Sequence, residues 1–196
     1  MENFKREDVR RLTGTAIFIA IVVILQLLGS FIRFGPFSIS LVAVPIVVGS
    51  ALYGRRSGAV LGLAFGLAVL ISGDAALFLS FHPLGTILVV MSKGLACGLA
   101  AGVVYALLSK KNQTLAVTVS AVVCPIVNTG IFLLGCLIFC MPLLREWSVS
   151  MGFGENVGSY MILGLVGGNF LVELLSNVLL CPLILRLIRI GGKRIR

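Results

Sequence analysis

Long apolar runs follow one another along almost the whole chain, and they restrict its fold more than any other feature. A run of about 20 apolar residues is long enough to cross the hydrocarbon core of a bilayer as a helix. Only 12% of the residues are charged, whereas a soluble domain carries about a quarter, and no polar stretch is long enough to fold alone. We predict an all-α, multi-pass membrane protein whose residues 1–196 form one domain of six transmembrane helices. The predicted spans are 13–31, 39–53, 58–72, 84–108, 115–141 and 160–188.

The basic residues predict the orientation of these spans, because loops rich in Lys and Arg remain in the cytoplasm. Thirteen of the 16 basic residues fall in segments that an even number of spans places on one side. These are Lys5, Arg6, Arg10, Arg11, Arg55, Arg56, Lys110, Lys111, Arg186, Arg189, Lys193, Arg194 and Arg196. Arg33 and Arg145 lie in the opposite loops, and Lys93 lies inside a span. Both termini are therefore predicted to be cytoplasmic, and the basic charge indicates topology rather than a nucleic-acid partner.

Two series of glycines recur at intervals of four residues. They are Gly58, Gly62 and Gly66 in GAVLGLAFG, and Gly94, Gly98 and Gly102 in KGLACGLAAG. Small residues at this spacing let two helix backbones approach closely in lipid, so we interpret both series as helix-packing surfaces. The second and third spans are short and are separated only by GRRSG. Their length leaves open whether they are thin, tilted or partly re-entrant.

The sequence contains no constellation that indicates catalysis. It has no HExxH or GxSxG motif and no paired-carboxylate set. Its single histidine, His82, and its five scattered cysteines make no obvious zinc-ligand set. The phosphate-binding pattern G-x-x-x-x-G-K-[ST] is also absent, so any ATP-driven step would need a motor on another chain. We predict that the chain is not an enzyme and has no catalytic residue, metal or cofactor.

The stretch GNFLVELLSN places three polar side chains on one face of an otherwise apolar helix. Asn169, Glu173 and Asn177 follow one another at intervals of four residues. Ionisable groups inside a membrane cost roughly 2.5 to 3.5 kcal/mol at the centre on insertion scales, so they need a partner, a cavity or a function. A polar stripe in this position is therefore a candidate binding surface.

Polar groups on three predicted helices lie at similar depth. With a rise of about 1.5 Å per residue, Lys93 lies roughly 13 Å and Asn169 roughly 14 Å below the outer ends of their spans. Asn128, midway along the fifth span, falls near the same level. This convergence predicts a cavity that opens to the outside. The candidate substrate-binding residues are Gln26, Lys93, Asn128, Trp147, Asn169, Glu173 and Asn177.

Each candidate also has a structural interpretation. Lys93 and Glu173 could form a salt bridge that serves only the fold. Asn128 and Asn177 could join helices by hydrogen bonds, which contribute about 0.6 kcal/mol each on average in a membrane protein. Trp147 lies in a predicted outer loop, where tryptophan more often anchors a protein at the membrane interface.

The first span, TGTAIFIAIVVILQ, carries the pattern Ala16-x-x-x-Ala20 on one helix face. This motif resembles the coupling face of the S-components of energy-coupling factor (ECF) vitamin importers. The stretch VPIVVGSALYGRRSGAVLGLAFG is similar to the segment of that family in which a glycine ends the second helix and G-x-x-x-G opens the third. Here GRR replaces the usual Gly-Pro of the turn. The resemblance covers nearly the whole chain in length and span number.

The resemblance implies a capture subunit in the plasma membrane of a prokaryote, folded as an ECF S-component-like bundle. A water-soluble vitamin would bind in an outward pocket lined by the fourth to sixth helices, where Asn169 and Glu173 would face Lys93 and Asn128. Asn177 would close the floor of this pocket. The partners would be a transmembrane coupling subunit and two ATPase subunits, and the first-helix alanines would contact the coupling subunit.

The choice of vitamin is a separate prediction. A buried lysine suits a carboxylate, and the predicted polar zone holds few aromatic side chains on which a flat ring could stack. Pantothenate is therefore favoured over riboflavin, folate or thiamine. The alternative function is a stand-alone, ion-coupled secondary transporter or channel that uses Lys93 and Glu173 as a relay.

Overall fold

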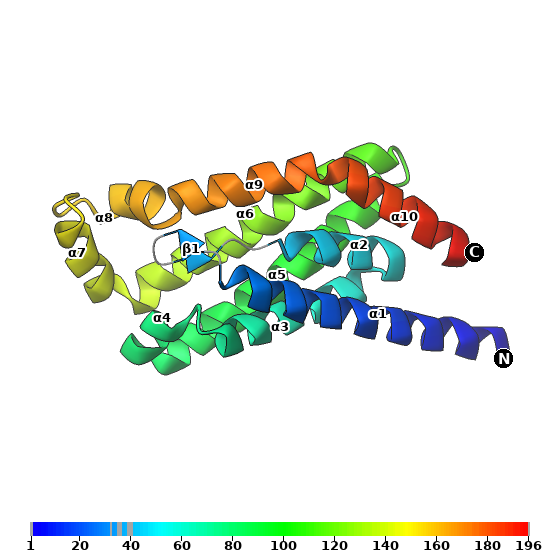
Figure 1. The fold of residues 1–196 in the computed structure, drawn as a ribbon, viewed down its shortest axis with the longest axis horizontal. Helices are drawn as coiled ribbons and strands as arrows, with labels where there is room; N and C mark the ends of the chain where they lie inside the picture. Colours follow the sequence, from blue (N-terminus) through cyan, green and yellow to red (C-terminus); the bar gives the residue numbers. More distant parts are fainter. Residues whose placement is uncertain (1, 32, 35–36, 39–40, 196) are drawn as a thin grey trace.

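Long helices lie side by side and form the body of the molecule (Figure 1). The computed structural model describes residues 2–31, 33–34, 37–38 and 41–195. The helical elements are α1 (Glu2–Gly29), α2 (Ala43–Tyr53), α3 (Arg55–Ser72), α4 (Ala76–Phe81), α5 (Pro83–Leu108), α6 (Gln113–Phe139), α7 (Met141–Ser150), α8 (Val157–Ser159), the π-helix η1 (Tyr160–Gly167), α9 (Gly168–Leu179) and α10 (Cys181–Ile195). The short strands β1 (Arg33–Phe34) and β2 (Phe37–Ser38) pair antiparallel. Figure 1 shows that α1 begins and α10 ends at the same end of the bundle.

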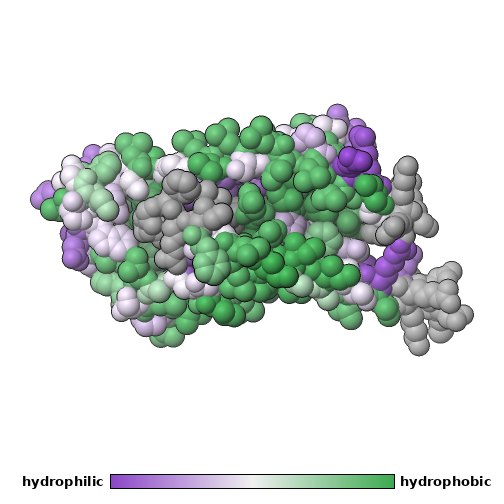
Figure 2. All heavy atoms as spheres, viewed as in Figure 1, coloured by the Kyte–Doolittle hydropathy of each residue, from purple (hydrophilic) through white to green (hydrophobic). Residues whose placement is uncertain are grey.

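The predicted helical membrane fold is confirmed at the level of its class. Within the described residues, five helical stretches are long and apolar enough to cross a membrane. They are Glu7–Gly29, Arg55–Ser72, Pro83–Leu108, Gln113–Phe139 and Val157–Leu179. Figure 2 shows hydrophobic side chains over the middle of the visible face and hydrophilic ones gathered toward its ends. A belt of this kind matches the apolar interior of a bilayer between two polar surfaces.

The predicted second span corresponds to α2, which has 11 residues. Its predicted start, Ile39, lies outside the described residues. A helix of this length rises roughly 16 Å, about half of the hydrocarbon core. Most of its side chains are buried, with Ile46 and Val47 at the centre of the main apolar core. α2 therefore fills one half of the bundle, beside α10 and toward the chain ends (Figure 1).

The structure divides the predicted sixth span, 160–188, into three consecutive segments: η1, α9 and α10. The membrane-length stretch ends at Leu179, and Leu180 separates it from α10. Pro182 lies in the first turn of α10, where the missing N–H of proline costs no helical hydrogen bond. The same proline prevents α9 from continuing into α10 as one regular helix, because it cannot donate a hydrogen bond to the preceding turn. The apolar run in the sequence thus hides a helix boundary.

The two glycine series bring the backbones of α3 and α5 into direct contact. A Cβ atom at Gly62 would overlap the carbonyl oxygen of Gly94, and one at Gly98 would overlap that of Gly58. Only glycine permits so close an approach between these helices. The interpretation of both series as helix-packing surfaces is confirmed.

We expect Gly62→Ala to destabilise the fold by about 1 to 3 kcal/mol, because the added methyl group must push the α5 backbone away. The measurement is thermal unfolding of the purified protein in detergent. Gly130→Ala on α6 is the control, since no atom lies within 4 Å of the added Cβ. There, the higher helix propensity of alanine should stabilise the protein by up to about 1 kcal/mol. Equal stability of the two variants would contradict the role assigned to the glycines.

Candidate functional site

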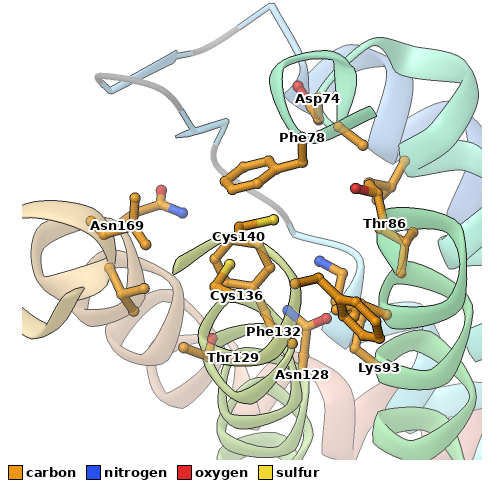
Figure 3. A pocket seen from close by; sticks show the side chains of 18 of the residues that line it. Asp74, Phe78, Thr86, Lys93, Asn128, Thr129, Phe132, Cys136, Cys140 and Asn169 are labelled. Carbon is orange, nitrogen blue, oxygen red and sulfur yellow. The ribbon is translucent and has the colours of Figure 1, made fainter. Parts of the chain in front are cut away.

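A cavity lies between α5, α6 and the η1–α9 stretch, in the half of the bundle away from the chain ends (Figures 1 and 3). Its volume is about 110 Å³, whereas one water molecule needs roughly 10 to 15 Å³ on the same measure. Polar and thiol side chains in its wall are Gln26, Asp74, Thr86, Lys93, Asn128, Thr129, Cys136, Cys140, Asn169 and Glu173. Its size and mixed lining suit a small organic molecule with several polar groups.

Lys93 lies between two aromatic rings in this cavity. Its Nζ is 5.6 Å from the ring centroid of Phe65 on α3 and 5.4 Å from that of Phe132 on α6. The negative faces of aromatic rings attract a cation at this range. Among the described residues, Lys93 and Glu173 line the same cavity without forming an ion pair. The ammonium group is thus held in place by rings while its charge stays available to a bound anion.

Two other helices bring buried hydrogen-bond acceptors to the wall of this cavity. The Oδ1 atoms of Asn128 on α6 and Asn169 on α9 are buried and have no hydrogen-bond partner in the described part of the chain. Glu173, one turn beyond Asn169, is 8% exposed. Figure 3 shows Asn169 and Lys93 on opposite sides of the cavity, with the α6 side chains between them. Each buried, unsatisfied acceptor costs about 1 to 3 kcal/mol, which a ligand that donates hydrogen bonds would recover.

Gln26 lines the cavity from α1. Its side chain is held by Asp74, which is not among the predicted ligand contacts. Its Nε2 donates to Oδ2 of Asp74 at 2.7 Å. Asp74 follows the left-handed Gly73 that ends α3, in a segment expected to be a solvated outer loop. The structure instead puts Asp74 in the cavity wall. A hydrogen bond between residues this far apart in sequence leaves no local signal.

The cavity wall, as far as the chain is described, includes neither Asn177 nor Trp147. Asn177 is 1% exposed and lies one turn beyond Glu173, with no partner for its amide within the described structure. Trp147 on α7 packs edge-on against Phe78 of α4, with ring centroids 5.8 Å apart. Phe78 does line the cavity, so Trp147 supports a wall residue from behind.

The expectation of few aromatic side chains around the polar groups is wrong. The cavity wall contains Phe65, Phe78, Phe132, Phe139 and Phe170. Phe132 lies one helical turn from Asn128, a spacing that could have revealed it. Phe65 comes from α3, and only the close packing of α3 on α5 brings it beside Lys93. The ring of Phe78 meets those of Phe132 and Trp147 edge-on, an arrangement that builds a wall rather than a slot for a flat ligand.

Ala16 and Ala20 are both exposed on α1. The neighbouring Thr15 is buried, and its Oγ1 donates to Oγ of Ser57 on α3 at 3.0 Å. This bond fixes the rotation of α1 on the bundle, so the alanines point away from it. Together with the exposed Ile17 and Ile21, they form an outward apolar surface. The two small alanine side chains form a strip along this surface, called the α1 strip below.

Comparisons with known proteins agree with this architecture. Residues 10–185 match the family model described as ECF transporter, substrate-specific component. The chain is also 29% identical to the pantothenic acid transporter PanT of Lactococcus lactis subsp. cremoris (strain MG1363), in an alignment that covers 92% of each chain. The family match extends over all the membrane-length helices. The chain therefore belongs to the family of substrate-specific components (S-components) of ECF transporters.

Proposed function

We propose that this chain captures pantothenate from outside a prokaryotic cell and delivers it through an ATP-driven ECF module. The observation that carries the proposal is the combination of one partly buried cation, Lys93, with buried acceptors that have no partner in the described residues, all in a single cavity. The similarity to a pantothenic acid transporter supports the same ligand independently.

The chemistry of pantothenate matches the groups in the cavity. Its carboxylate would lie against the ammonium of Lys93, which has lost much of its water to two phenyl rings. Its two hydroxyls and its amide N–H are donors for Asn128, Asn169 and Glu173. Its geminal methyl groups are apolar and suit phenylalanine walls. The carboxylate, both hydroxyls and the amide N–H of the ligand would thereby gain partners when water is excluded.

The proposed topology has six spans, with α2 as the short second one and both termini in the cytoplasm. The distribution of basic residues supports this orientation, because the exposed Arg55 and Arg56 and the exposed Lys110 and Lys111 flank spans on the predicted inner side. The cavity lies toward the opposite end of the bundle (Figure 1) and would open to the outside.

ATP hydrolysis belongs to partner subunits in this proposal. The chain would bind a transmembrane coupling subunit that works with two ATPases. The exposed strip at Ala16 and Ala20 supports this role, since small side chains let a partner helix approach the α1 backbone closely in lipid. The chain itself acts by binding and not by catalysis.

We expect the purified chain to bind pantothenate in calorimetry, and not riboflavin, folate or thiamine. Lys93→Gln should weaken binding at least about 30-fold, because removal of one member of a buried charged pair costs roughly 2 kcal/mol or more. Arg145→Gln, which removes an exposed charge on α7, should leave the affinity unchanged. Equal affinities of the Lys93 variant and the parent protein would refute the carboxylate contact.

The asparagines provide a second, matched comparison. Asn169→Ala should weaken pantothenate binding by roughly 5-fold to 150-fold, the equivalent of one lost hydrogen bond of about 1 to 3 kcal/mol. Asn177→Ala lies on the same helix but outside the cavity wall, and we expect its affinity to match that of the parent chain. The measurement is again calorimetry, with circular dichroism as the check on folding. If Asn177→Ala is the more damaging change, the cavity extends one turn deeper than described.

Bulky substitutions on the α1 strip should prevent assembly with the coupling subunit without affecting the capture of pantothenate. We expect Ala16→Leu with Ala20→Leu to abolish co-purification with the ATPases and uptake in cells, while pantothenate binding to the isolated chain persists. Ile17→Leu, a change of nearly constant volume at another exposed position of α1, is the control. An intact complex in the double variant would show that the partner binds elsewhere.

A further inference from the structure

The last helix, α10, is attached to the bundle by one face only. Ile184 and Ile188, which are 0% and 3% exposed, belong to the main apolar core. Gly191 packs so closely on α2 that an added Cβ would lie 2.8 Å from the Leu52 side chain. α10 begins after the last membrane-length stretch has ended at Leu179. It is therefore a rigidly held helix at the edge of the apolar belt, with a free outer face.

That outer face has two parallel stripes of different chemistry. Leu183, Leu187 and Ile190 are 48%, 42% and 52% exposed and follow one another at helical spacing. Arg186 and Arg189 are exposed beside them. A shallow groove runs along this side, bordered by both arginines and by Pro182, Leu185 and Ile190. A helix of this composition can present its apolar stripe to acyl chains and its basic stripe to lipid headgroups.

The two arginines have no carboxylate partner within the described structure. α10 contains no Asp or Glu, and the start of α3 and the segment between α5 and α6 carry further exposed basic residues, Arg55–Arg56 and Lys110–Lys111. Figure 2 shows hydrophilic side chains gathered at the end of the bundle where α10 lies. Guanidinium groups bind phosphate oxygens through several N–H donors at once. Two guanidinium groups beside an apolar surface therefore suit a ligand in which a phosphate group is attached to hydrocarbon chains.

From this arrangement we infer that the α10 groove binds an anionic phospholipid of the inner leaflet. Arg186 and Arg189 hold the phosphate, while the acyl chains lie along Leu185 and Ile190. The assignment to the inner leaflet rests on the proposed function, because the topology proposed there places α10 on the cytoplasmic side. The groove itself does not depend on that topology. Basic residues near a membrane surface are attracted to the negative charge of anionic lipid headgroups.

A lipid fits this face better than a helix of a partner protein does. A docking helix could contact the apolar stripe of Leu183, Leu187 and Ile190, but the two arginines that border the groove would then need acidic partners on that helix. The α1 strip at Ala16 and Ala20 has no such interruption. The bound lipid would fix the C-terminal end of the bundle at the membrane surface.

The test uses the full chain in neutral detergent micelles, with dioleoyl phosphatidylglycerol as the probe. Retention of the lipid is measured by native mass spectrometry, and the lipid-induced rise in melting temperature is recorded in parallel. The variants are Arg186→Gln with Arg189→Gln, the matched surface control Arg55→Gln with Arg56→Gln, and Ile190→Ser for the apolar edge. Dioleoyl phosphatidylcholine and free glycerol 3-phosphate are the control ligands. Pantothenate calorimetry on the same samples reports the vitamin site separately.

We expect the parent chain and the Arg55–Arg56 variant to retain phosphatidylglycerol, the Arg186–Arg189 variant to lose at least 10-fold in occupancy at equal lipid, and Ile190→Ser to fall between them. Phosphatidylcholine and glycerol 3-phosphate should give little retention or stabilisation. Equal losses in both arginine pairs would overturn the groove in favour of general basic attraction. Stabilisation by glycerol 3-phosphate alone would overturn the role of the apolar surface. Unchanged lipid retention in the Arg186–Arg189 variant would overturn the assignment of the phosphate to these two arginines.

The vitamin measurement separates this inference from the proposed function. Pantothenate binding that persists while lipid retention shows no dependence on Arg186 and Arg189 would refute the lipid site and leave the proposed function intact. Selective lipid retention in a chain that does not bind pantothenate would refute the proposed ligand and leave the groove standing.

Discussion

The contact between the backbones of α3 and α5 is the constraint on which the rest of the structure depends. Because glycines remove every side chain from this interface, the two helices approach until their carbonyl groups limit the distance. Lys93 directly precedes one contacting glycine, and Phe65 follows another by three residues. The same contact that holds the helices together therefore sets a cation beside an aromatic ring at 5.6 Å. Residues that are close in the sequence of α3 and α5 thus provide both the helix packing and the binding chemistry.

The short α2 complements this arrangement. It occupies the half of the bundle near the chain ends, where Ile46 and Val47 complete a tightly packed core. On the side of α2 away from the chain ends, the chain forms the short β1–β2 pair in place of a longer helix (Figure 1). The buried acceptors of the cavity in that half of the bundle favour a ligand that donates hydrogen bonds.

Sequence reasoning predicted those parts of the molecule that depend on local pattern. Apolar runs located the long helices, i+4 glycines located the interface, and membrane depth brought Lys93, Asn128, Asn169 and Glu173 into one cavity wall. It missed what depends on distant contacts. Asp74 enters the wall through its bond to Gln26, and Phe65 through helix packing. Hydropathy also merged α9 with α10, because a helix boundary inside an apolar run changes hydrogen bonding without changing composition.

The π-helical segment η1 has a consequence for how such a binding site can change. A π-turn holds more residues than an α-turn, so side chains after it are rotated about the helix axis relative to those before it. Residues of η1, including Tyr160 and Leu165, pack in the outer apolar cluster, while the α-helical spacing of Asn169 and Glu173 begins only after Gly167. Insertion or loss of one residue within η1 would turn the outer end of the helix, including Leu165 in the apolar part of the cavity wall, while Asn169 and Glu173 keep their spacing. The segment thus allows the apolar wall of the cavity to change while the polar face of the same span is retained.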